Sequence, residues 1–198
     1  MLTPGKGRLK DKIFIPYNIE CQHTVLNLSA LDVEIGPGVG WHPIQYATKH
    51  PERQLIGIEH TAEKFAKFKR RANNHRLTNL FPVHANAVSY LAAFFEEASI
   101  DRVLIKFPNP YPKPSQKAKR FHSQSAFMEL LHNLLKPNGT LTIETNKNWY
   151  AEEAAEDLKA VFSEVRLSTY VDSSGRLLSH FEQKYLASKQ KCYSISAS

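Results

Sequence analysis

A glycine-rich turn at residues 34–40, Glu-Ile-Gly-Pro-Gly-Val-Gly, most constrains the fold of this 198-residue chain. The turn ends an apolar run at 31–35 that is typical of a strand, and the pattern at 41–50 predicts a helix with Pro43 in its first turn. Glycines let a chain reverse sharply, and their missing Cβ lets a ligand lie against the backbone. A strand, a glycine turn and a helix in this order predict an α/β fold with a ligand at the turn.

Strands and helices continue to alternate along the chain. Apolar runs predict strands at 54–59, 80–84, 102–107 and 140–145, and helical spacing predicts helices at 61–76, 88–98, 121–136 and 150–162. This alternation is typical of a doubly wound, mainly parallel sheet with helices on both faces. The tail from residue 165 predicts two strands joined directly by a turn at 173–175, and therefore an antiparallel hairpin at one edge of the sheet.

Composition excludes several classes of protein. No apolar run approaches the roughly 18–20 residues of a membrane span, and the first residues lack the apolar stretch of a signal peptide. Only Cys21 and Cys192 are present, without metal-ligand spacing. We therefore expect a cytoplasmic chain with no metal site and no membrane partner, consisting of an N-terminal segment at 1–30 and one domain at 31–198. The excess of 26 Lys and Arg over 19 Asp and Glu hints at a polyanionic partner such as RNA.

Two acidic residues near the glycine turn indicate which kind of ligand it could bind. Glu34 precedes the first glycine, and Glu59 closes the next expected strand, where a carboxylate can accept hydrogen bonds from both hydroxyls of a ribose. The last glycine of a dinucleotide fingerprint would fall on Trp41, which is too large for that position. The pattern instead indicates a turn that binds an adenosine-containing ligand, although such turns also occur for packing alone.

A proline-rich loop follows the expected strand at 102–107. Prolines at 108, 110, 112 and 114 predict that the whole stretch 108–120 is a loop without helix. Tyr111 could stack on a planar base. Four cations could contact a phosphate backbone, namely Lys113, Lys117, Lys119 and Arg120. The alternative is a solvated basic loop, and a second basic run at 64–76 is best interpreted as a solvated helix face.

Several segments, in the same order, resemble the tRNA (guanine-N7-)-methyltransferases, which are class I enzymes that use S-adenosylmethionine (SAM). The segments are EIGPGVG (34–40), GIE (57–59), NAVSYL (86–91), DRVLIKFPNPYPK (101–113), LKPNGTLTIETN (135–146) and SHFEQKY (179–185). The resemblance covers about residues 31–195. It implies a Rossmann-like sheet of seven strands, SAM as the cofactor and tRNA as the partner.

The resemblance also implies roles for single residues. The SAM side of the site would comprise Glu34, Gly36, Gly38 and Gly40 in the turn, Glu59 at the ribose, and Asn86 and Ala87 beside the adenine. The acceptor side would comprise Asn109 at the catalytic position and Lys113, Asn146, Ser179 and Glu182 as substrate-binding residues.

The chain departs from the family pattern on the acceptor side. Asn109 stands where the family has the Asp regarded as catalytic, Asn146 replaces a substrate-side Asp, and Asn86 replaces an Asp of bacterial members. Asparagine keeps one acceptor oxygen but has no charge, so it cannot be a base. Guanine N7 already has a free lone pair. Its methylation needs no deprotonation and can depend on positioning and electrostatics.

The sequence therefore predicts a SAM-dependent N-methyltransferase that acts on guanine N7 in tRNA. Two alternatives stay open at this point. One is a diverged N-methyltransferase for a small heteroaromatic nitrogen compound, and the other is a non-catalytic homologue that holds RNA or SAM. Either a monomer or a homodimer is compatible with the sequence.

Overall fold

The computed structural model describes residues 7–10, 12–26 and 29–198. Within these residues, one mixed sheet contains seven strands: β3 (Ala30–Ile35), β4 (Arg53–Glu59), β5 (Leu80–His84), β6 (Ile100–Lys106), β7 (Leu135–Thr145), β8 (Val165–Tyr170) and β9 (Cys192–Ala197). The helices are α1 (Trp41–Lys49), α2 (Ala62–His75), α3 (Ala87–Phe94), the 3-10 helix η1 (Pro114–Lys119), α4 (Ser125–Leu134), α5 (Asn148–Leu158) and α6 (His180–Ala187).

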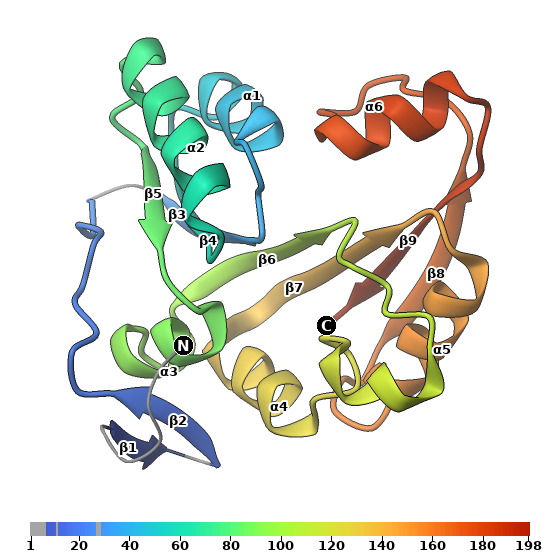
Figure 1. The fold of residues 1–198 in the computed structure, drawn as a ribbon, viewed down its shortest axis with the longest axis horizontal. Coiled ribbons are helices and arrows are strands. Elements are labelled where there is room, and N and C mark those ends of the chain that lie inside the picture. Colours follow the sequence, from blue (N-terminus) through green and yellow to red (C-terminus); the bar gives the residue numbers. More distant parts are fainter. Residues whose placement is uncertain (1–6, 11, 27–28) are drawn as a thin grey trace.

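The strands lie in the order β5-β4-β3-β6-β7-β9-β8 (Figure 1). The neighbours from β5 to β7 pair in parallel, and β9 is antiparallel to both β7 and β8. The chain winds outward from β3 to β5 and then crosses back to β6. The strand order therefore reverses between β3 and β6, which is the position where open α/β sheets bind ligands.

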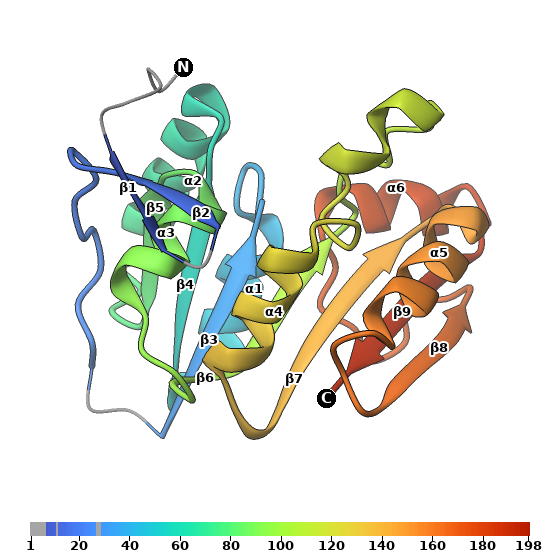
Figure 2. The same ribbon diagram turned by 90° about the horizontal axis from the view of Figure 1, so that it is seen from below.

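Helices cover both faces of the sheet, as the alternation of elements predicts. Figures 1 and 2 show α1 and α2 on one face and α3, α4 and α5 on the other. The strands β3 and β4 are buried along almost their whole length, including the charged residues Asp32 and Glu34 of β3. Val33 of β3, Val103 of β6 and Ile143 of β7 are fully buried in the core, together with Tyr90 of α3 and Leu131 of α4. The expected doubly wound sheet, mainly parallel with an antiparallel C-terminal pair, is confirmed.

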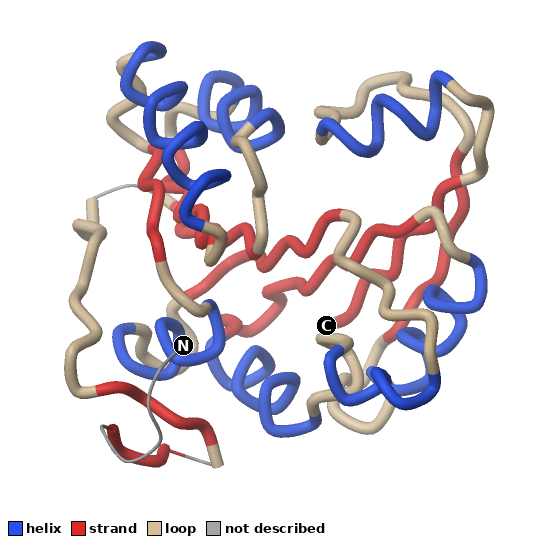
Figure 3. The backbone as a smooth tube through the Cα atoms, in the orientation of Figure 1, coloured by secondary structure: helices blue, strands red, loops and turns tan. Residues whose placement is uncertain are grey.

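Two expectations about connections are wrong. The β8 and β9 strands do pair antiparallel, but the segment between them contains the helix α6 and is more than a tight turn (Figure 3). The proline loop also contains the 3-10 helix η1, in which Pro114 occupies a first-turn position, where the absence of its N–H costs little. Proline is disfavoured in the interior of a helix but is tolerated in its first turn.

The described part of the N-terminal segment forms an antiparallel hairpin of β1 (Gly7–Lys10) and β2 (Ile13–Pro16). Ile13 and Ile15 are buried in the same apolar core as the sheet. The hydroxyl of Ser89 in α3 donates to the carbonyl of Phe14 at 2.7 Å, which fixes β2 against α3. Other parts of the expected 1–30 segment (residues 1–6, 11 and 27–28) lie outside the described residues, and the boundary at residue 30 stays a prediction.

Candidate active site

A pocket of about 420 Å³ opens at the carboxyl ends of β3, β4 and β6. It therefore occupies the place where the strand order reverses. Its walls come from the glycine turn, the end of β4 with the start of α2, the end of β6 with the proline loop, and the start of α6. Segments that are far apart in the sequence thus meet around one cavity.

The three glycines of the turn all have positive φ angles, but their surroundings differ. A Cβ built on Gly36 or Gly38 would meet none of the described atoms within 4 Å, so these two glycines leave open space on the pocket side. A Cβ on Gly40 would lie 2.2 Å from Cδ2 of the buried Phe68 in α2. Gly36 and Gly38 therefore leave room for a ligand, and Gly40, which lies outside the pocket lining, lets α1 approach α2.

Glu59 links the glycine turn to the start of α2. Its Oε2 accepts a hydrogen bond from the Gly38 N–H at 2.9 Å, and its Oε1 accepts one from the Thr61 N–H at 2.8 Å. The residue is only 4% exposed, yet it lines the pocket. Because each carboxylate oxygen can accept more than one hydrogen bond, Glu59 is held in place and can still accept from two hydroxyls of a ligand.

Glu34 lies deeper in the pocket wall, at the end of β3. Its Oε2 is 2.6 Å from Nδ1 of His42 in α1, and both side chains are buried. This contact connects the strand before the glycine turn to the helix after it. His42 is therefore part of the support of the turn.

The proline loop brings a polar and an aromatic side chain to the opposite wall. Asn109 and Tyr111 both line the pocket, and Oδ1 of Asn109 accepts from the Tyr111 N–H at 3.2 Å. Phe107 and Tyr111 have positive φ angles of 50° and 46°. Bulky residues rarely adopt this conformation, so the loop is strained beside the pocket, which is common at functional sites.

Arg120 is buried and pairs within the protein, although its place in the basic run predicts a residue available to a phosphate backbone. It is 6% exposed, donates to the Tyr111 carbonyl at 2.9 Å, and pairs with Glu153 of α5. Its guanidinium also lies over the ring of Trp149. Arg120 therefore fixes the proline loop from inside. Lys117 is exposed but pairs with the same Glu153 at 2.8 Å.

Comparison with known proteins identifies the family. A family model described as a putative methyltransferase matches residues 29–195. A tRNA (guanine-N(7)-)-methyltransferase of Nitrosomonas europaea is 35% identical over 156 residues, which cover 77% of this chain and 68% of the relative. The chain belongs to the tRNA (guanine-N(7)-)-methyltransferase family. The enzyme of the same name from Thermotoga maritima is 28% identical over 152 residues, and the match spans 77% of this chain but only 48% of that relative.

Solved structures show the same methyltransferase fold. The 16S rRNA methyltransferase KamB superimposes with a TM-score of 0.65 at 13% identity, covering 86% of this chain and 87% of KamB. A 16S rRNA (adenine(1408)-N(1))-methyltransferase from Catenulisporales acidiphilia, solved with SAM as cosubstrate, superimposes with a TM-score of 0.61 at 16% identity, covering 86% of this chain and 85% of that one. The family, the Rossmann-like fold and the SAM dependence expected from the sequence are thereby confirmed.

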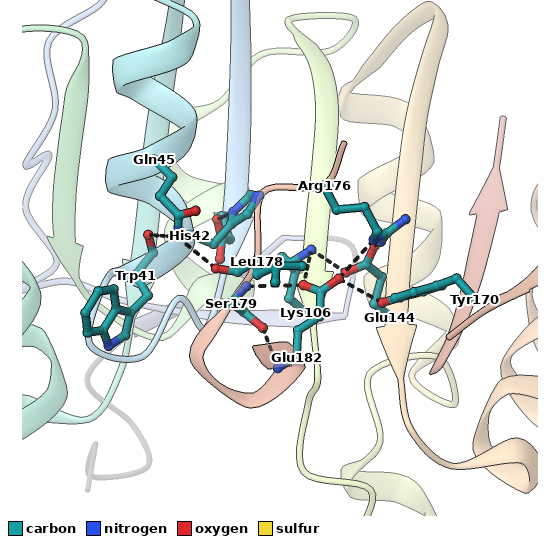
Figure 4. A network of polar contacts seen from close by, with 11 residues as sticks. Trp41, His42, Gln45, Lys106, Glu144, Tyr170, Arg176, Leu178, Ser179 and Glu182 are labelled. Carbon is teal, nitrogen blue, oxygen red and sulfur yellow. Dashed lines mark hydrogen bonds and ion pairs between the residues drawn. The ribbon is translucent and has the colours of Figure 1, made fainter. Parts of the chain in front are cut away.

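A buried group of charges lies behind the pocket wall, at the end of β6 and the start of α6 (Figure 4). Lys106, the last residue of β6, pairs with Glu144 of β7 and lies 3.1 Å from Oε2 of Glu182 in α6. Arg176 pairs with the same two carboxylates, and the Tyr170 hydroxyl donates to Glu182 at 3.0 Å. We call these five residues the charge cluster. Two cations and two carboxylates balance one another within it.

Electrostatics keeps the cluster charged although it is buried. Burial alone would lower the pKa of Lys106, but Glu144 and Glu182 outweigh it and raise this pKa. Burial alone would raise the pKa of Glu182, but Lys106, the Ser179 N–H and Arg176 hold it below its usual value. Burial and the two carboxylates raise the pKa of Tyr170. Near neutral pH the cluster therefore contains an ionised Glu182, a protonated Lys106 and a neutral Tyr170 phenol.

Helix α6 is fixed to the pocket at its first turn. Ser179 and Glu182 form a capping box in which each side chain bonds the other residue's N–H at 3.2 Å. Gln45 of α1 donates to the carbonyl of Leu178 at 2.9 Å, just before the helix (Figure 4). Ser179, His180 and Phe181 consequently line the pocket.

The structure brings only some of the expected site residues to the pocket. Those that line it are Glu34, Gly36, Gly38, Glu59, Asn109 and Ser179. Glu182 lies behind the wall in the charge cluster. Those elsewhere are Gly40, Asn86, Ala87, Lys113 and Asn146.

The residues outside the pocket have other surroundings. Asn86 caps α3 by accepting from the Ser89 N–H at 3.2 Å, and it lines a separate cavity of about 230 Å³. Ala87 is buried in the core. Lys113 is exposed, and Asn146 donates to Gln190 at 3.0 Å. Their assigned roles stay predictions.

Sequence reasoning missed Lys106, Arg176, His42 and Phe181 as parts of this site. Lys106 carried a usable signal, because a lysine inside the apolar run Val-Leu-Ile-Lys-Phe must find a partner when its strand is buried. Helix α6 also carried one, because Ser-His-Phe-Glu at 179–182 has the spacing of a capping box. Arg176 and His42 had no comparable local signal.

Among the described residues, no helix is both long and apolar enough to span a membrane. In the same part of the chain, no group of three or more His, Cys, Asp or Glu side chains could hold a metal ion.

Proposed function

We propose that this chain methylates guanine N7 in tRNA, with SAM bound in the pocket between the glycine turn and the proline loop. The observation that carries the proposal is the meeting of Gly36, Gly38 and Glu59 with Asn109 and Ser179 around one cavity at the carboxyl ends of the strands. When bound, SAM supplies a methyl group on a positively charged sulfur. A tRNA substrate suits the cytoplasmic location expected from the sequence.

The residues of the chain need only to bind and orient, because guanine N7 is already a nucleophile. Glu59 accepts from the ribose hydroxyls, and the open faces of Gly36 and Gly38 let the ligand approach the backbone. Asn86, which lines the separate cavity, is proposed to contact the adenine together with the neighbouring Ala87. Asn109 presents an amide oxygen at the wall of the pocket where the guanine is proposed to bind. Ser179 and Phe181 line the same part of the pocket and would contact the base. Close positioning of two reactants accounts for a large part of the rate of such a displacement.

Contact with the tRNA is proposed at the exposed edge of the pocket. Lys113 and Lys119 are exposed on the proline loop, and Lys64 of α2 reaches the pocket from the other side. Lysines on both sides of the mouth suit a phosphate backbone. Asn146 is proposed to approach the substrate only if its contact with Gln190 opens.

The direct test is transfer of a labelled methyl group from SAM to undermodified tRNA, followed by identification of the modified nucleoside. We expect 7-methylguanosine. A chain that binds SAM but labels no tRNA would contradict the proposal and support a non-catalytic homologue.

A second candidate function is methylation of a small heteroaromatic nitrogen compound. It is favoured by Asn109 and Asn146, which replace carboxylates of the family on the acceptor side. Reversing the charges of the exposed Lys113 and Lys119 to Glu separates the two functions. Loss of activity supports a tRNA acceptor, and activity that persists on a small acceptor supports the alternative.

Asn109→Asp measures what the missing carboxylate contributes. The fold should tolerate the change, because a carboxylate can accept from the Tyr111 N–H as the amide does. We expect the rate of tRNA methylation to rise about tenfold or more, since a charged contact typically contributes about 1.5–3 kcal/mol. The measurement is kcat/KM on tRNA. A lower rate would show that the asparagine is adapted to another acceptor.

A further inference from the structure

Lys106 is the charged residue of the cluster that also reaches the pocket. It lines the cavity beside Asn109, while its side chain is only 8% exposed. Its ammonium group is held from behind by Glu144 of β7 and Glu182 of α6. Figure 4 shows the Lys106 nitrogen next to the carboxylates of Glu144 and Glu182. The position of this nitrogen is therefore fixed by two separate elements.

An ammonium group has three N–H donors and no acceptor. Within the described part of the chain, its contacts are those with Glu144 and Glu182, which leaves one donor for a ligand in the pocket. A buried donor without a partner is costly, so occupation of the pocket by an acceptor atom is favourable.

The charge balance of the cluster indicates which acceptor fits. Arg176 pairs with the same two carboxylates as Lys106, so the cluster holds two cations and two anions. A ligand carboxylate is not needed to neutralise Lys106, whereas a neutral carbonyl oxygen can accept its free N–H. Guanine presents such an oxygen, O6, next to N7, and adenine presents an amino donor at the same position.

We propose that Lys106 donates a hydrogen bond to O6 of the acceptor guanine and thereby selects guanine against adenine. This inference rests on the proposed function. Lys106 is a specificity-determining residue in this arrangement, and Glu144 and Glu182 are positioning residues that hold its nitrogen at the pocket wall.

The test compares base analogues on one tRNA. The methylated guanine is mapped with the unaltered chain, and transcripts are then made with inosine or 2-aminopurine at that position. Inosine keeps N7 and O6, whereas 2-aminopurine keeps N7 and lacks O6. The variants are Lys106→Met and, as a matched control, Arg176→Met, which removes a cation from the same two carboxylates without changing the pocket lining.

We expect the unaltered chain to prefer guanine over 2-aminopurine by about ten- to a hundredfold in kcat/KM, the usual range for a hydrogen bond to a charged donor. Lys106→Met should bring this ratio close to one while the ratio of guanine to inosine stays unchanged. Arg176→Met should lower both rates alike and keep the preference. If Lys106→Met does not fold, the double variant Lys106→Met with Glu144→Gln restores one cation to one carboxylate and gives the same readout.

Two results would overturn the inference while the proposed function stands. One is that Lys106→Met lowers kcat/KM by the same factor on guanine and on 2-aminopurine. The other is that Lys106→Met weakens the binding of SAM and leaves the ratio of guanine to 2-aminopurine unchanged. This result would show that Lys106 donates to the carboxylate of SAM. If the unaltered chain binds SAM but methylates no tRNA, the proposed function fails and the inference fails with it.

Discussion

A glycine at the pocket can be required for two reasons: its backbone conformation, or the space that its missing side chain leaves for a ligand or a neighbouring residue. Gly36, Gly38 and Glu59 could be predicted from the sequence, because a glycine turn after a strand and an acid at the end of the next strand are local patterns. Gly40 was predicted in the same group but packs against Phe68, which is distant in the sequence and meets the turn only in the folded chain. The pattern of glycines alone cannot distinguish these two reasons.

Replacing Gly40 with alanine tests this difference. The new Cβ would lie 2.2 Å from the buried Phe68 ring, whereas Gly36→Ala has open space and shares the positive φ angle. Both variants bear the strain of the left-handed conformation, about 1–2 kcal/mol, and only Gly40→Ala adds overpacking of about 1–3 kcal/mol. We expect Gly40→Ala to unfold at a clearly lower urea concentration than Gly36→Ala. Gly36→Ala should weaken SAM binding more than Gly40→Ala. Equal loss of stability in both variants would contradict this explanation.

At the level of helices and strands, the sequence predicts the sheet well and the connections poorly. Strand and helix periodicity locates the strands and α-helices from β3 to α5, because each has buried apolar residues. It misses the 3-10 helix η1, which has no buried residue. Helix α6 has only one buried residue, Glu182, so its apolar periodicity is weak and the tail was interpreted as two directly joined strands. Lys106 and Glu182 carried local signals, but the charge cluster as a whole could not be predicted, because it joins β6, β7 and α6 with Arg176 and the end of β8.

The contribution of the capping box to the stability of α6 can be tested by mutation. Ser179→Ala removes the side-chain oxygen that accepts from the Glu182 N–H, which typically costs about 1 kcal/mol. We expect faster hydrogen exchange in α6 and weaker substrate binding, because the first turn of this helix is a wall of the pocket. Thr61→Ala is the control: the Thr61 side chain makes no capping hydrogen bond to α2, so exchange in α2 should stay the same. Unchanged exchange in α6 would show that the charge cluster alone holds the helix.

For the whole molecule, a buried histidine couples stability to pH. His122 packs against Tyr150 of α5, and its Nδ1 lies 2.8 Å from Asp157. Burial lowers the pKa of His122 and outweighs Asp157, which raises it. The unfolded chain therefore binds the proton more readily than the folded chain. The contribution of His122 to stability is complete above about pH 6.5 and is lost as the pH falls from there through the lowered pKa.

His122→Gln should therefore flatten the fall in the free energy of unfolding below about pH 6.5. One such group contributes at most about 1.4 kcal/mol per pH unit. Urea unfolding at a series of pH values measures this slope, with the exposed His75→Gln as the control. A slope that His122→Gln leaves unaltered would mean that the imidazole gains a proton without unfolding.

The strand order also has a consequence for synthesis on the ribosome. β9 lies between β7 and β8, and among the described strands β8 pairs only with β9. While the chain is being translated, β8 therefore has no neighbour in the sheet until Cys192–Ala197 has left the exit tunnel. The charge cluster includes Tyr170 at the end of β8 and Arg176 just after it, so it can form completely only after β9 has joined the sheet.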